Sequence, residues 1–367
     1  MEKYSQRASE EVSVIFKALG HPVRLWMAEQ LSTTERSVQE FVRWSGLDYS
    51  TVSLHLKAMR DAGIVTSRKR SNYQLYRLIY PCIPDLIHHI RLKNQFDKTH
   101  PDNTMKFQQI RSATSIITYG KNRFLIDPWF APKDSYDPIP VAKTKGRRFP
   151  FVELPMPVEE IISGIDAVIV THLHFDHFDQ SSVEALPKTL PLICQDETDA
   201  RTLRDYGFED VRALTSDGLS FQSVTLHRTE CLHGQPGRLE ELYRPLGMRS
   251  ECMGVVFTGG GEDKAFYLAA DTIWFEGVQQ AIETWKPGII AVNAAEASAE
   301  NYGRIIMGTQ DIDKVLEAAP EATIIATHMD TVGHAELSRA DLRRYIADRH
   351  LETRILVPED GETIELS

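Results

Sequence analysis

The sequence lacks the features that mark membrane-spanning and secreted proteins. No apolar stretch of its 367 residues approaches the roughly 20 that a helix needs to span a bilayer, and the start, MEKYSQRASEE, has no signal-peptide pattern. Cysteine is scarce: Cys82, Cys194, Cys231 and Cys252 are far apart in sequence and form no CxxC pair. Such spacing fits free thiols in a reducing compartment better than a disulfide scaffold or a thiolate zinc site. These absences predict a cytoplasmic protein.

Charge is divided unevenly along the chain, which is long enough for two domains with separate cores. Residues 1–100 hold 15 Lys and Arg against 10 Asp and Glu, a balance of +5. Because the whole chain has a net charge of −11, residues 101–367 carry −16. This asymmetry suggests two bodies with different partners, the first binding a polyanion. A merely solvated surface is the alternative explanation.

The first hundred residues contain two short helical patterns joined by a tight turn. One helix is expected from about Ser37 to Trp44, and a second, with Asp48 or Ser50 as N-cap, runs to about Ala62. Such a pair forms a helix-turn-helix, whose second helix enters the major groove of DNA. Its outward face carries side chains able to meet base edges and phosphates. They are Ser50, Thr51, Ser53, His55 and Lys57, opposite the inward-facing Val52, Leu56 and Met59.

A basic hairpin is expected after the second helix. The stretch IVTSRKRSNYQLYRL predicts two short strands around a turn at Ser71-Asn72, with Arg68, Lys69 and Arg70 before the tip. Such a wing grips phosphates without reading base sequence. The structural alternative is a winged helix that serves only dimerisation or protein contact.

The stretches ALGHPVRLWMAEQL and STVSLHLKAMRDAGIV, together with the wing, resemble the winged-helix domain of the ArsR family of bacterial repressors. The resemblance covers Ser13–Leu78 and implies a homodimer that binds double-stranded DNA, with the first and last helices at the dimer interface. Metal-sensing members carry cysteines in the first helix of the motif, and SVQEFVRW has none, so arsenic-type sensing is not expected. We expect this domain to span residues 1–95 and a linker to follow at 96–104.

The last helix of this segment contains two adjacent histidines, His88 and His89. Neighbouring residues on a helix point about 100° apart, which is unsuitable for chelating one ion. We therefore interpret them as exposed or interface histidines rather than as a metal-binding pair.

The second part of the chain, residues 105–367, alternates strand-like and helical patterns. Short apolar runs such as SIITY, DAVIVT, IIAVN and TIIATH each end in a polar turn, and helical stretches such as FEGVQQAIETW lie between them. Strands that alternate with helices predict a layered α/β domain whose sheets are largely covered.

The nonapeptide THLHFDHFD directly follows the expected strand DAVIVT. His172 and His174 are two residues apart, so in extended backbone they point the same way. Asp176 and His177 come after the chain turns and can face a second point. Loops at the carboxyl ends of strands bind the ligands of α/β proteins. The pattern predicts two metal ions that share a bridging hydroxide.

Two metal ions need more ligands than this nonapeptide supplies. Three further candidates follow other strand-like runs: His233 in VTLHRTECLHG, Asp271 in AFYLAADT and His328 in TIIATHMD. A single His or Asp at a strand end is usually structural. Their joint presence downstream of HxHxDH favours a metal centre.

The order HxHxDH, then His, Asp and His, resembles the metallo-β-lactamase superfamily, whose fold is an αββα sandwich. The resemblance implies one metal held by His172, His174 and His233, a second held by Asp176, His177 and His328, and Asp271 bridging them. Zinc is the expected ion, with manganese or iron as alternatives. LIDP and LAADT look most like the branch with ascorbate-6-phosphate lactonase and phospholipase-D-type phosphodiesterases, which usually has Gly where this chain has Ala270.

These ligands predict a hydrolase. Two cations lower the pKa of a shared water towards neutrality, and the resulting hydroxide attacks a carbonyl carbon or phosphorus. Asp176 is expected to orient the nucleophile and carry a proton, and Asp271 to hold both ions. The GxSxG motif of serine hydrolases is missing.

A loop after His233 contains three arginines, Arg238, Arg244 and Arg249. Arginine suits bidentate recognition of phosphate or carboxylate. The loop therefore favours an anionic substrate, either a phosphodiester or a phosphorylated lactone, with solvated rim charges as the alternative.

Three functions fit these observations. The first is a hydrolase tethered to a DNA-binding module whose promoter binding responds to the substrate. The second is a ligand- or metal-sensing repressor without significant catalysis, and the third is a hydrolase whose winged helix only dimerises. The complete ligand set favours catalysis and the basic wing favours DNA binding, so the first is our hypothesis.

Overall fold

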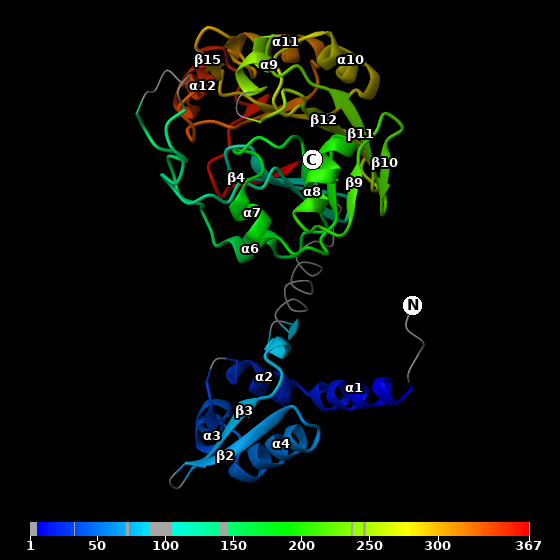
Figure 1. Cartoon of the computed structure of the whole chain (residues 1–367), viewed down its shortest axis with the longest axis vertical. Helices are drawn as coiled ribbons and strands as arrows, with labels where there is room; N and C mark the ends of the chain where they lie inside the picture. The colour runs from blue at the N-terminus through cyan, green and yellow to red at the C-terminus, as the bar shows by residue number, and fades with distance from the viewer. Residues whose placement is uncertain are drawn as a thin grey trace. The chain divides into compact units, whose positions relative to one another are not determined.

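The computed structural model describes residues 6–32, 34–70, 73–84, 86–87, 105–139, 146–235, 238–244 and 247–366. The chain divides into two compact units, Met1–Thr99 and His100–Ser367 (Figure 1). Each unit has its own hydrophobic core. His88, His89, the turn at Ser71-Asn72 and the expected linker at 96–104 lie outside the described residues. Within the described part, no helix is both long and apolar enough to cross a lipid bilayer.

The N-terminal unit is a helix-turn-helix with a wing. Its described helices are α1 (Gln6–Leu19), α2 (Pro22–Gln30), α3 (Val38–Ser45) and α4 (Tyr49–Asp61). Its sheet has the order β1 (Arg36–Ser37), β3 (Tyr73–Leu78), β2 (Val65–Arg70). Strands β2 and β3 pair antiparallel and form the predicted wing.

Local sequence explains where these helices begin and end. A capping box joins Ser37 and Glu40 at the start of α3, and Gly46, with a φ of 70°, ends it. Asp48 is the N-cap of α4 and accepts a hydrogen bond from the backbone N–H of Thr51. Of the two N-cap candidates, the structure therefore selects Asp48. The predicted helices are confirmed to within one or two residues.

The core of this unit forms around α4. Val52, Leu56 and Met59 are fully buried, as predicted, and they pack with Met27 of α2 and Phe41 of α3. The helical period of three and four residues thus fixes which face of α4 remains available for DNA.

The C-terminal unit contains two seven-stranded sheets packed face to face. The first has the order β19, β4, β5, β6, β7, β8, β9. Its strands are β4 (Met105–Arg111), β5 (Thr114–Tyr119), β6 (Asn122–Ile126), β7 (Ala167–Val170), β8 (Leu192–Cys194), β9 (Val211–Ala213) and β19 (Thr363–Leu366). From β6 to β9 neighbouring strands run parallel.

The second sheet has the order β10, β11, β12, β13, β14, β17, β18. Its strands are β10 (Leu219–Phe221), β11 (Val224–Glu230), β12 (Met253–Gly259), β13 (Phe266–Leu268), β14 (Ile289–Asn293), β17 (Thr323–Thr327) and β18 (Ile355–Leu356). Strands β13, β14, β17 and β18 run parallel, and the short β15 (Ser298–Ala299) and β16 (Gly303–Arg304) pair separately.

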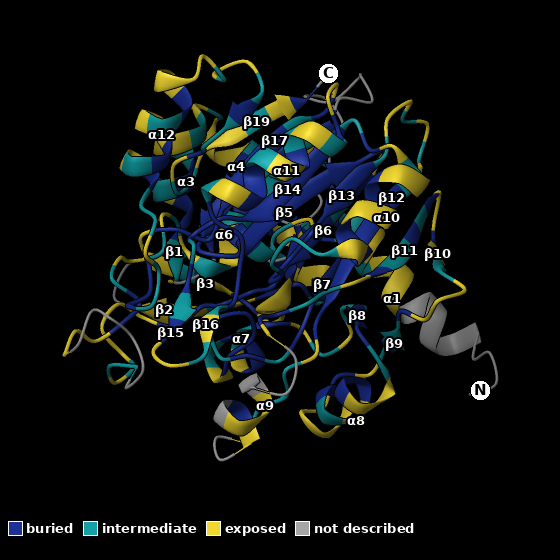
Figure 2. Ribbon diagram, turned by 90° about the horizontal axis from the view of Figure 1, so that it is seen from above, coloured by how far each residue is buried: buried dark blue, intermediate teal, exposed yellow. Residues whose placement is uncertain are grey.

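Helices cover both outer faces of this sandwich. In Figure 1, α10 (Glu276–Trp285), α11 (Thr309–Ala318) and α12 (Arg339–Asp348) lie on one side of the sheets, and α6 (Val158–Ile162), α7 (Gln180–Ala185) and α8 (Glu197–Asp205) lie on the other. Figure 2 shows the strands mostly buried and the outer faces of the helices exposed. The predicted αββα sandwich is confirmed.

The layer between the sheets is strongly aromatic. Phe124 lies 5.3 Å from Phe257, and Phe107 lies 6.3 Å from Phe266, measured between ring centroids. These contacts join the two sheets into a single core. The rigid core in turn fixes the strand ends from which the functional loops emerge.

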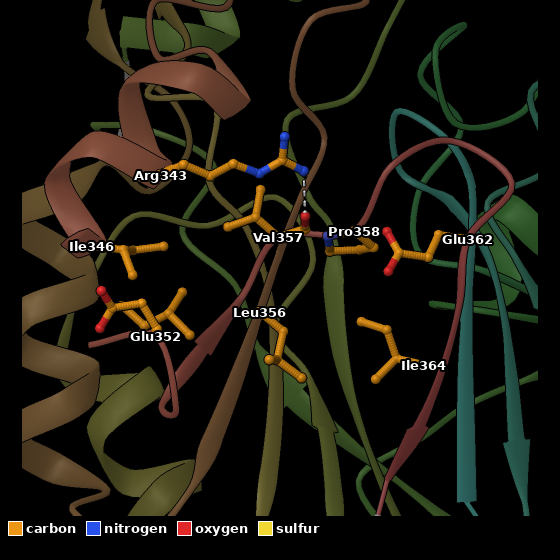
Figure 3. A pocket seen from close by; sticks show the side chains of 9 residues that line it. Arg343, Ile346, Glu352, Leu356, Val357, Pro358, Glu362 and Ile364 are labelled. Atoms are coloured by element: carbon orange, nitrogen blue, oxygen red, sulfur yellow. Dashed lines mark hydrogen bonds between the residues drawn. The ribbon is translucent and has the colours of Figure 1, made fainter. Parts of the chain in front are cut away.

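An apolar pocket of about 360 Å³ lies where edge strands β18 and β19 approach each other. Figure 3 shows Leu356 and Ile364 lining it, with Arg343 donating a hydrogen bond to the carbonyl of Val357 at 2.7 Å. None of its lining residues belongs to the predicted metal ligands.

Candidate metal centre

The HxHxDH segment leaves β7 and turns at once. The backbone N–H groups of His177 and Phe178 both donate to the carbonyl of His174, at 3.0 and 2.9 Å. The turn separates the pair His172 and His174 from the pair Asp176 and His177. All four of these side chains are buried. The pair His172 and His174 belongs to one ligand group and the pair Asp176 and His177 to another, in line with the spacing.

The fold brings all seven predicted ligands into one buried cluster. Their ligand atoms form three overlapping groups, each within 4.8 Å: His172, His174 and His233; His172, His177 and Asp271; and Asp176, His177 and His328. The contributing segments follow β7, β11, β13 and β17. Strands β7, β13 and β17 lie in parallel runs, and the loops after such strands meet at the carboxyl edge of each sheet.

Asp271 occupies the centre of this cluster. Its Oδ2 atom lies 3.2 Å from His177 Nε2, 3.8 Å from His233 Nε2 and 3.9 Å from His172 Nε2. Its Oδ1 atom lies 3.9 Å from His328 Nε2 and accepts a hydrogen bond from Asn293 at 2.6 Å. One carboxylate thus contacts ligands assigned to both predicted metal positions, as a bridging role requires.

Each imidazole of the cluster has one nitrogen engaged by a neighbouring group. The contacts are His172 Nδ1 with the Thr171 hydroxyl (3.0 Å), His174 Nε2 with the Arg249 carbonyl (2.6 Å), His177 Nδ1 with Asp127 (2.8 Å), His233 Nδ1 with the Ile305 carbonyl (2.9 Å) and His328 Nδ1 with the Ser112 hydroxyl (3.4 Å). Such contacts fix the orientation and tautomer of metal-binding histidines. The other nitrogen of each ring is the one available to an ion; that of His233 meets the Tyr243 hydroxyl, and those of His177 and His328 lie 3.2 Å apart.

Asp127 is a residue that sequence reasoning left without a role. Its carboxylate accepts hydrogen bonds from the backbone N–H and hydroxyl of Thr171, both at 2.7 Å, and from His177 Nδ1 at 2.8 Å. It therefore ties the start of the HxHxDH segment to strand β6. The signal was present in LIDP, where an aspartate directly follows a buried strand.

Backbone conformation beside the cluster explains one departure from the branch pattern. Ala270 has a φ of 58° and His328 a φ of 66°. In this left-handed region glycine is free of strain, whereas other residues pay roughly 1–2 kcal/mol. A glycine before the bridging aspartate therefore suits the backbone, and Ala270 accepts the same conformation at a cost.

Burial and charge set the protonation of the ligands. Burial lowers the pKa of His172 and His233, and lowers the pKa of His174 to about 3, which favours neutral imidazoles. Burial by itself would raise the pKa of Asp271, but the nearby rings of His177 and His328 hold it well below its usual value. Neutral imidazoles and ionised carboxylates are the forms that bind cations. Burial alone would lower the pKa of His177 as well, but Asp271 and Asp127 raise it well above its usual value, so an ion that binds this ring must displace a proton.

The residues present fit a pair of divalent cations. His172 Nε2 is buried and has no hydrogen-bond partner among the described residues, and a buried polar atom without a partner is costly. A cation bound by this nitrogen would remove that cost. Five imidazole nitrogens with two carboxylates form a donor set suited to zinc, manganese or iron.

Tyr243 is a second residue near the cluster that the sequence did not indicate. It ends α9 (Arg238–Tyr243), and its hydroxyl lies 3.2 Å from His233 Nε2. Its ring lies 4.6 Å from that of His174, between centroids. No motif surrounds it, so only the packing of α9 reveals its position.

The three arginines proposed for substrate binding differ in the structure. Arg249 forms ion pairs with Asp196 and Asp199, both at 2.8 Å, and with Glu251 at 3.4 Å. Arg244 is exposed, and the side chain of Arg238 lies outside the described part. The guanidinium of Arg249 is thus engaged by carboxylates, while its backbone carbonyl holds His174.

Two cysteines that are distant in sequence lie together beside Asp271. The register of β11 and β12 pairs Glu230 with Met253, so the next residues outward are Cys231 and Cys252. Both are free thiols, as expected. The Cys252 thiol contacts the carbonyl of Asp271 at 2.9 Å, and burial raises its pKa.

The predicted DNA-contacting residues of α4 differ in exposure. Ser50 and Lys57 are exposed, whereas Thr51, Ser53 and His55 are half-buried. The hydroxyls of Ser50 and Thr51 bond to Asp48, the N-cap. Between these polar groups, Leu54 is 66% exposed, an apolar side chain on the outward face that the sequence interpretation did not include.

The predicted wing residues, Arg68, Lys69 and Arg70, lie at the end of β2 and are exposed. They are not equivalent. Arg68 forms a two-pronged contact with Glu35 at 2.6 to 3.0 Å. No such contact is found for Lys69 among the described residues.

Comparison with known proteins agrees with this architecture. The Beta-lactamase superfamily domain matches residues 122–329, more than half of the chain, and the bacterial regulatory protein family arsR matches residues 21–67. The chain belongs to the beta-lactamase superfamily, and its second unit is a metal-dependent hydrolase domain fused to an ArsR-type helix-turn-helix.

Three relatives illustrate the match, two for the C-terminal unit and one for the N-terminal unit. UPF0173 protein YddR of Bacillus subtilis is 40% identical over 259 residues, which cover 71% of this chain and 99% of that protein. The crystal structure of isothiocyanate hydrolase from Delia radicum gut bacteria is 37% identical, with a TM-score of 0.67, and covers 71% of this chain and 99% of that chain. HTH-type transcriptional regulator Rv0081 of Mycobacterium tuberculosis is 37% identical over 73 residues, 20% of this chain and 64% of that protein.

Proposed function

We propose that the chain is a binuclear metal-dependent hydrolase joined to a DNA-binding module that regulates transcription. The observation that carries the catalytic half is the convergence of seven ligands, whose imidazoles are each held through one nitrogen by a neighbouring group outside the ligand set. Two divalent cations bound there would polarise the substrate and bring the pKa of a water molecule near neutrality. Zinc is our first choice of ion.

The chain's own carboxylates have distinct roles in this proposal. Asp271 contacts ligands on both sides and keeps the two halves of the site together. Asp176, with its Oδ2 atom 3.7 Å from His328 Nε2, orients the attacking water and accepts its proton. Asp127 and Asn293 hold His177 and Asp271 in place. Such prior positioning is a large part of catalysis by metallohydrolases.

We propose isothiocyanates as the first substrate class to test. Water adds to the central carbon of R–N=C=S, and the adduct breaks down to the amine R–NH2 and carbonyl sulfide. The 37% identity to an isothiocyanate hydrolase supports this choice. So does an aromatic cluster that includes Phe175 of the HxHxDH segment, with Tyr136 and Phe149 at ring distances of 5.6 and 5.5 Å. We infer that this cluster borders the substrate, where aromatic rings suit a neutral molecule with an apolar group.

An anionic substrate, either a phosphodiester or a phosphorylated lactone, is the second candidate. The exposed Arg244 still supports it. Arg249 gives it less support than the sequence suggested, because carboxylates already engage its guanidinium. Charge reversal at Arg244 should raise KM for an anionic substrate and spare a neutral one.

Metal analysis followed by a substrate panel tests the catalytic proposal. Purified protein should contain two equivalents of a divalent metal and hydrolyse phenethyl isothiocyanate faster than bis(p-nitrophenyl) phosphate or a neutral lactone. Faster hydrolysis of the phosphodiester would select the anionic class. Protein that holds two metal ions but hydrolyses none of the three would contradict the enzymatic half and favour a sensor without catalysis.

For the N-terminal unit we propose binding to double-stranded DNA as a homodimer. The basic wing and the outward face of α4 support DNA binding. On α1, Val12, Val14 and Phe16 are more than half exposed, and such an apolar surface suits a dimer interface. Gel shifts with the protein's own upstream DNA, together with light scattering, test both points. A monomeric protein that does not bind this DNA would contradict the proposal.

Regulation requires that a ligand bind the two DNA-affinity states unequally. We propose that the substrate does so. DNA affinity should therefore change when isothiocyanate or a competitive inhibitor is present. Equal affinities with and without ligand would mean two independent activities on one chain.

A further inference from the structure

We propose that Tyr243 is a catalytic residue whose hydroxyl donates a hydrogen bond to the substrate atom that gains negative charge as water attacks. This inference rests on the proposed hydrolase function and adds a specific donor to it. Tyr243 belongs to none of the ligand motifs and follows His233 by ten residues, at the end of α9.

The side chain of Tyr243 closes one side of the cluster. Its hydroxyl lies 3.2 Å from His233 Nε2, and its ring is nearly parallel to that of His233, with an angle of 14° between them. The ring of His174 lies 4.6 Å away. The residue is only 7% exposed. The hydroxyl therefore lies beside His233 and the ring beside His174, two of the three histidines proposed to hold the first ion.

The hydrogen bonding of His233 shows why this hydroxyl needs another acceptor. The Nδ1 atom of His233 lies 2.9 Å from the Ile305 carbonyl, which can accept only its N–H. The lone pair of the ring is thus on Nε2, where it accepts from the Tyr243 hydroxyl. That lone pair is also the one a cation would take. With an ion bound, the buried hydroxyl loses the acceptor that the described part of the chain gives it, and a buried donor is costly to leave unpaired.

A substrate atom beside the same ion would replace that acceptor. In the proposed reaction, attack on the central carbon places negative charge on the sulfur or nitrogen of an isothiocyanate, or on the oxygen of an ester. A fixed hydroxyl donor aimed at this atom stabilises the transition state more than the ground state. Proton transfer is not required, because a hydrogen bond alone supplies the stabilisation.

The structure holds Tyr243 rigidly enough for this role. Its backbone carbonyl accepts a hydrogen bond from the N–H of Met248 at 3.1 Å, and Gly247, with a φ of 68°, makes the turn that follows. Its ring is part of the apolar core that includes Ile305 and Ile306. A donor fixed before the substrate arrives loses little entropy on binding it.

The test compares Tyr243→Phe with Tyr345→Phe in the full-length protein loaded with metal. Tyr345 also carries a phenol, but its hydroxyl contacts Asp313, outside the cluster. Tyr243→Phe should lower kcat by about 10²-fold, the usual effect of removing one such donor, with KM nearly unchanged and two metal ions retained. Tyr345→Phe should leave kcat, KM and metal content unchanged.

A second measurement does not depend on turnover. Inorganic phosphate, a tetrahedral oxyanion, should bind the metal-loaded Tyr243→Phe protein about tenfold more weakly than wild type or Tyr345→Phe in calorimetry, because one hydrogen bond to a charged group is lost. A wild-type protein that hydrolyses no substrate would overturn the proposed function, and the phosphate comparison would still decide the role of Tyr243.

Three outcomes would overturn the assignment. One is unchanged kcat and phosphate affinity in Tyr243→Phe. Another is weaker metal binding with normal turnover for each bound metal pair, which would make Tyr243 a positioning residue for His233. The third is a phenolate-to-iron charge-transfer band in the Fe(III)-loaded wild type that Tyr243→Phe lacks, which would make Tyr243 a metal ligand.

Discussion

The candidate metal centre and the candidate DNA-binding face differ in how their polar groups are satisfied. In the metal centre the side chains are buried, and neighbouring groups orient each imidazole. On α4 and the wing, the polar groups bond locally, as Ser50 does to Asp48, or face solvent. Buried charge requires pre-formed partners, whereas phosphate contacts can form when DNA arrives. The comparison suggests that single substitutions in the metal centre cause large losses of hydrolysis or metal binding, whereas single substitutions on the DNA face cause small losses of DNA affinity.

The largest effect is expected from His172→Ala. His172 belongs to two of the three ligand groups, so its loss should empty or distort the site. Hydrolysis should fall by at least about 10³-fold, since bound cations contribute several kcal/mol to the transition state. DNA affinity measured without substrate should stay the same, because residues 21–67 carry the helix-turn-helix.

Metal content, kcat/KM and gel-shift affinity measured on the same preparation check this prediction. His350→Asn is a suitable control, because His350 is exposed and has a φ of 56°, which asparagine tolerates. Parallel losses of hydrolysis and DNA binding in His172→Ala would show that the two regions are not independent.

The ligands were predictable because each of them lies in a loop that follows a strand. Apolar runs mark the strands, and the carboxyl edge of the sheet collects what comes next, so HxHxDH, His233, Asp271 and His328 could be joined from sequence alone. The face of α4 was predictable for a similar reason, because Val52, Leu56 and Met59 have a fixed helical period.

Contacts made through long loops were not predictable. Arg249 appeared to be a substrate contact because the sequence does not show that Asp196 and Asp199 approach it from α8. Tyr243 was missed because its place depends on how α9 packs, which no periodicity fixes. Loop geometry depends on tertiary contacts, so the side chains that shape the pocket are the least accessible to sequence reasoning.

A smaller effect is expected from Asp127→Asn, which tests whether orientation of the ligands matters as much as their presence. The amide keeps the shape of the side chain but loses the charge that holds His177 Nδ1 and Thr171. Metal affinity should fall by about 10- to 100-fold, measured by competition with a chromogenic chelator. Asp166→Asn is the control, since Asp166 contacts the backbone N–H of Arg123. Equal metal affinity in both variants would contradict this role for Asp127.

Substitutions in the wing should change the salt dependence of DNA affinity by different amounts, depending on whether the replaced residue already forms an ion pair. Lys69→Ala should reduce the slope of log affinity against log salt by about 1, as expected for one lost phosphate contact. Arg68→Ala should reduce it less, because Glu35 already binds this guanidinium.

Glu35→Gln sharpens this comparison, since it should free Arg68 and strengthen DNA binding. Gel shifts or fluorescence anisotropy at several salt concentrations measure all three variants. A larger change in slope for Arg68→Ala than for Lys69→Ala would mean that the pair with Glu35 opens on DNA.

The smallest effect is expected from Arg249→Met, which separates a structural role from substrate binding. Arg249 forms an ion pair with Asp196. Burial alone would raise the pKa of Asp196, but hydrogen bonds, first among them those from this guanidinium, lower it to about 2. A carboxylate whose pKa is lowered by folding stabilises the folded state at pH values above its ordinary pKa, here near 3.8. This contribution is lost as the pH falls towards 2. In Arg249→Met the pKa of Asp196 should return towards 3.8, and the partly exposed pair should account for at most about 1 kcal/mol of stability at neutral pH.

NMR titration of the Asp196 carboxyl and urea unfolding at pH 7 and pH 3 measure these changes. The stability difference between wild type and Arg249→Met should be smaller at pH 3. KM should change equally for phenethyl isothiocyanate and for bis(p-nitrophenyl) phosphate, because the guanidinium contacts carboxylates and not the substrate. A rise in KM confined to the phosphodiester would instead restore Arg249 as an anion-binding residue, and the aromatic cluster around Phe175 would no longer decide the substrate class.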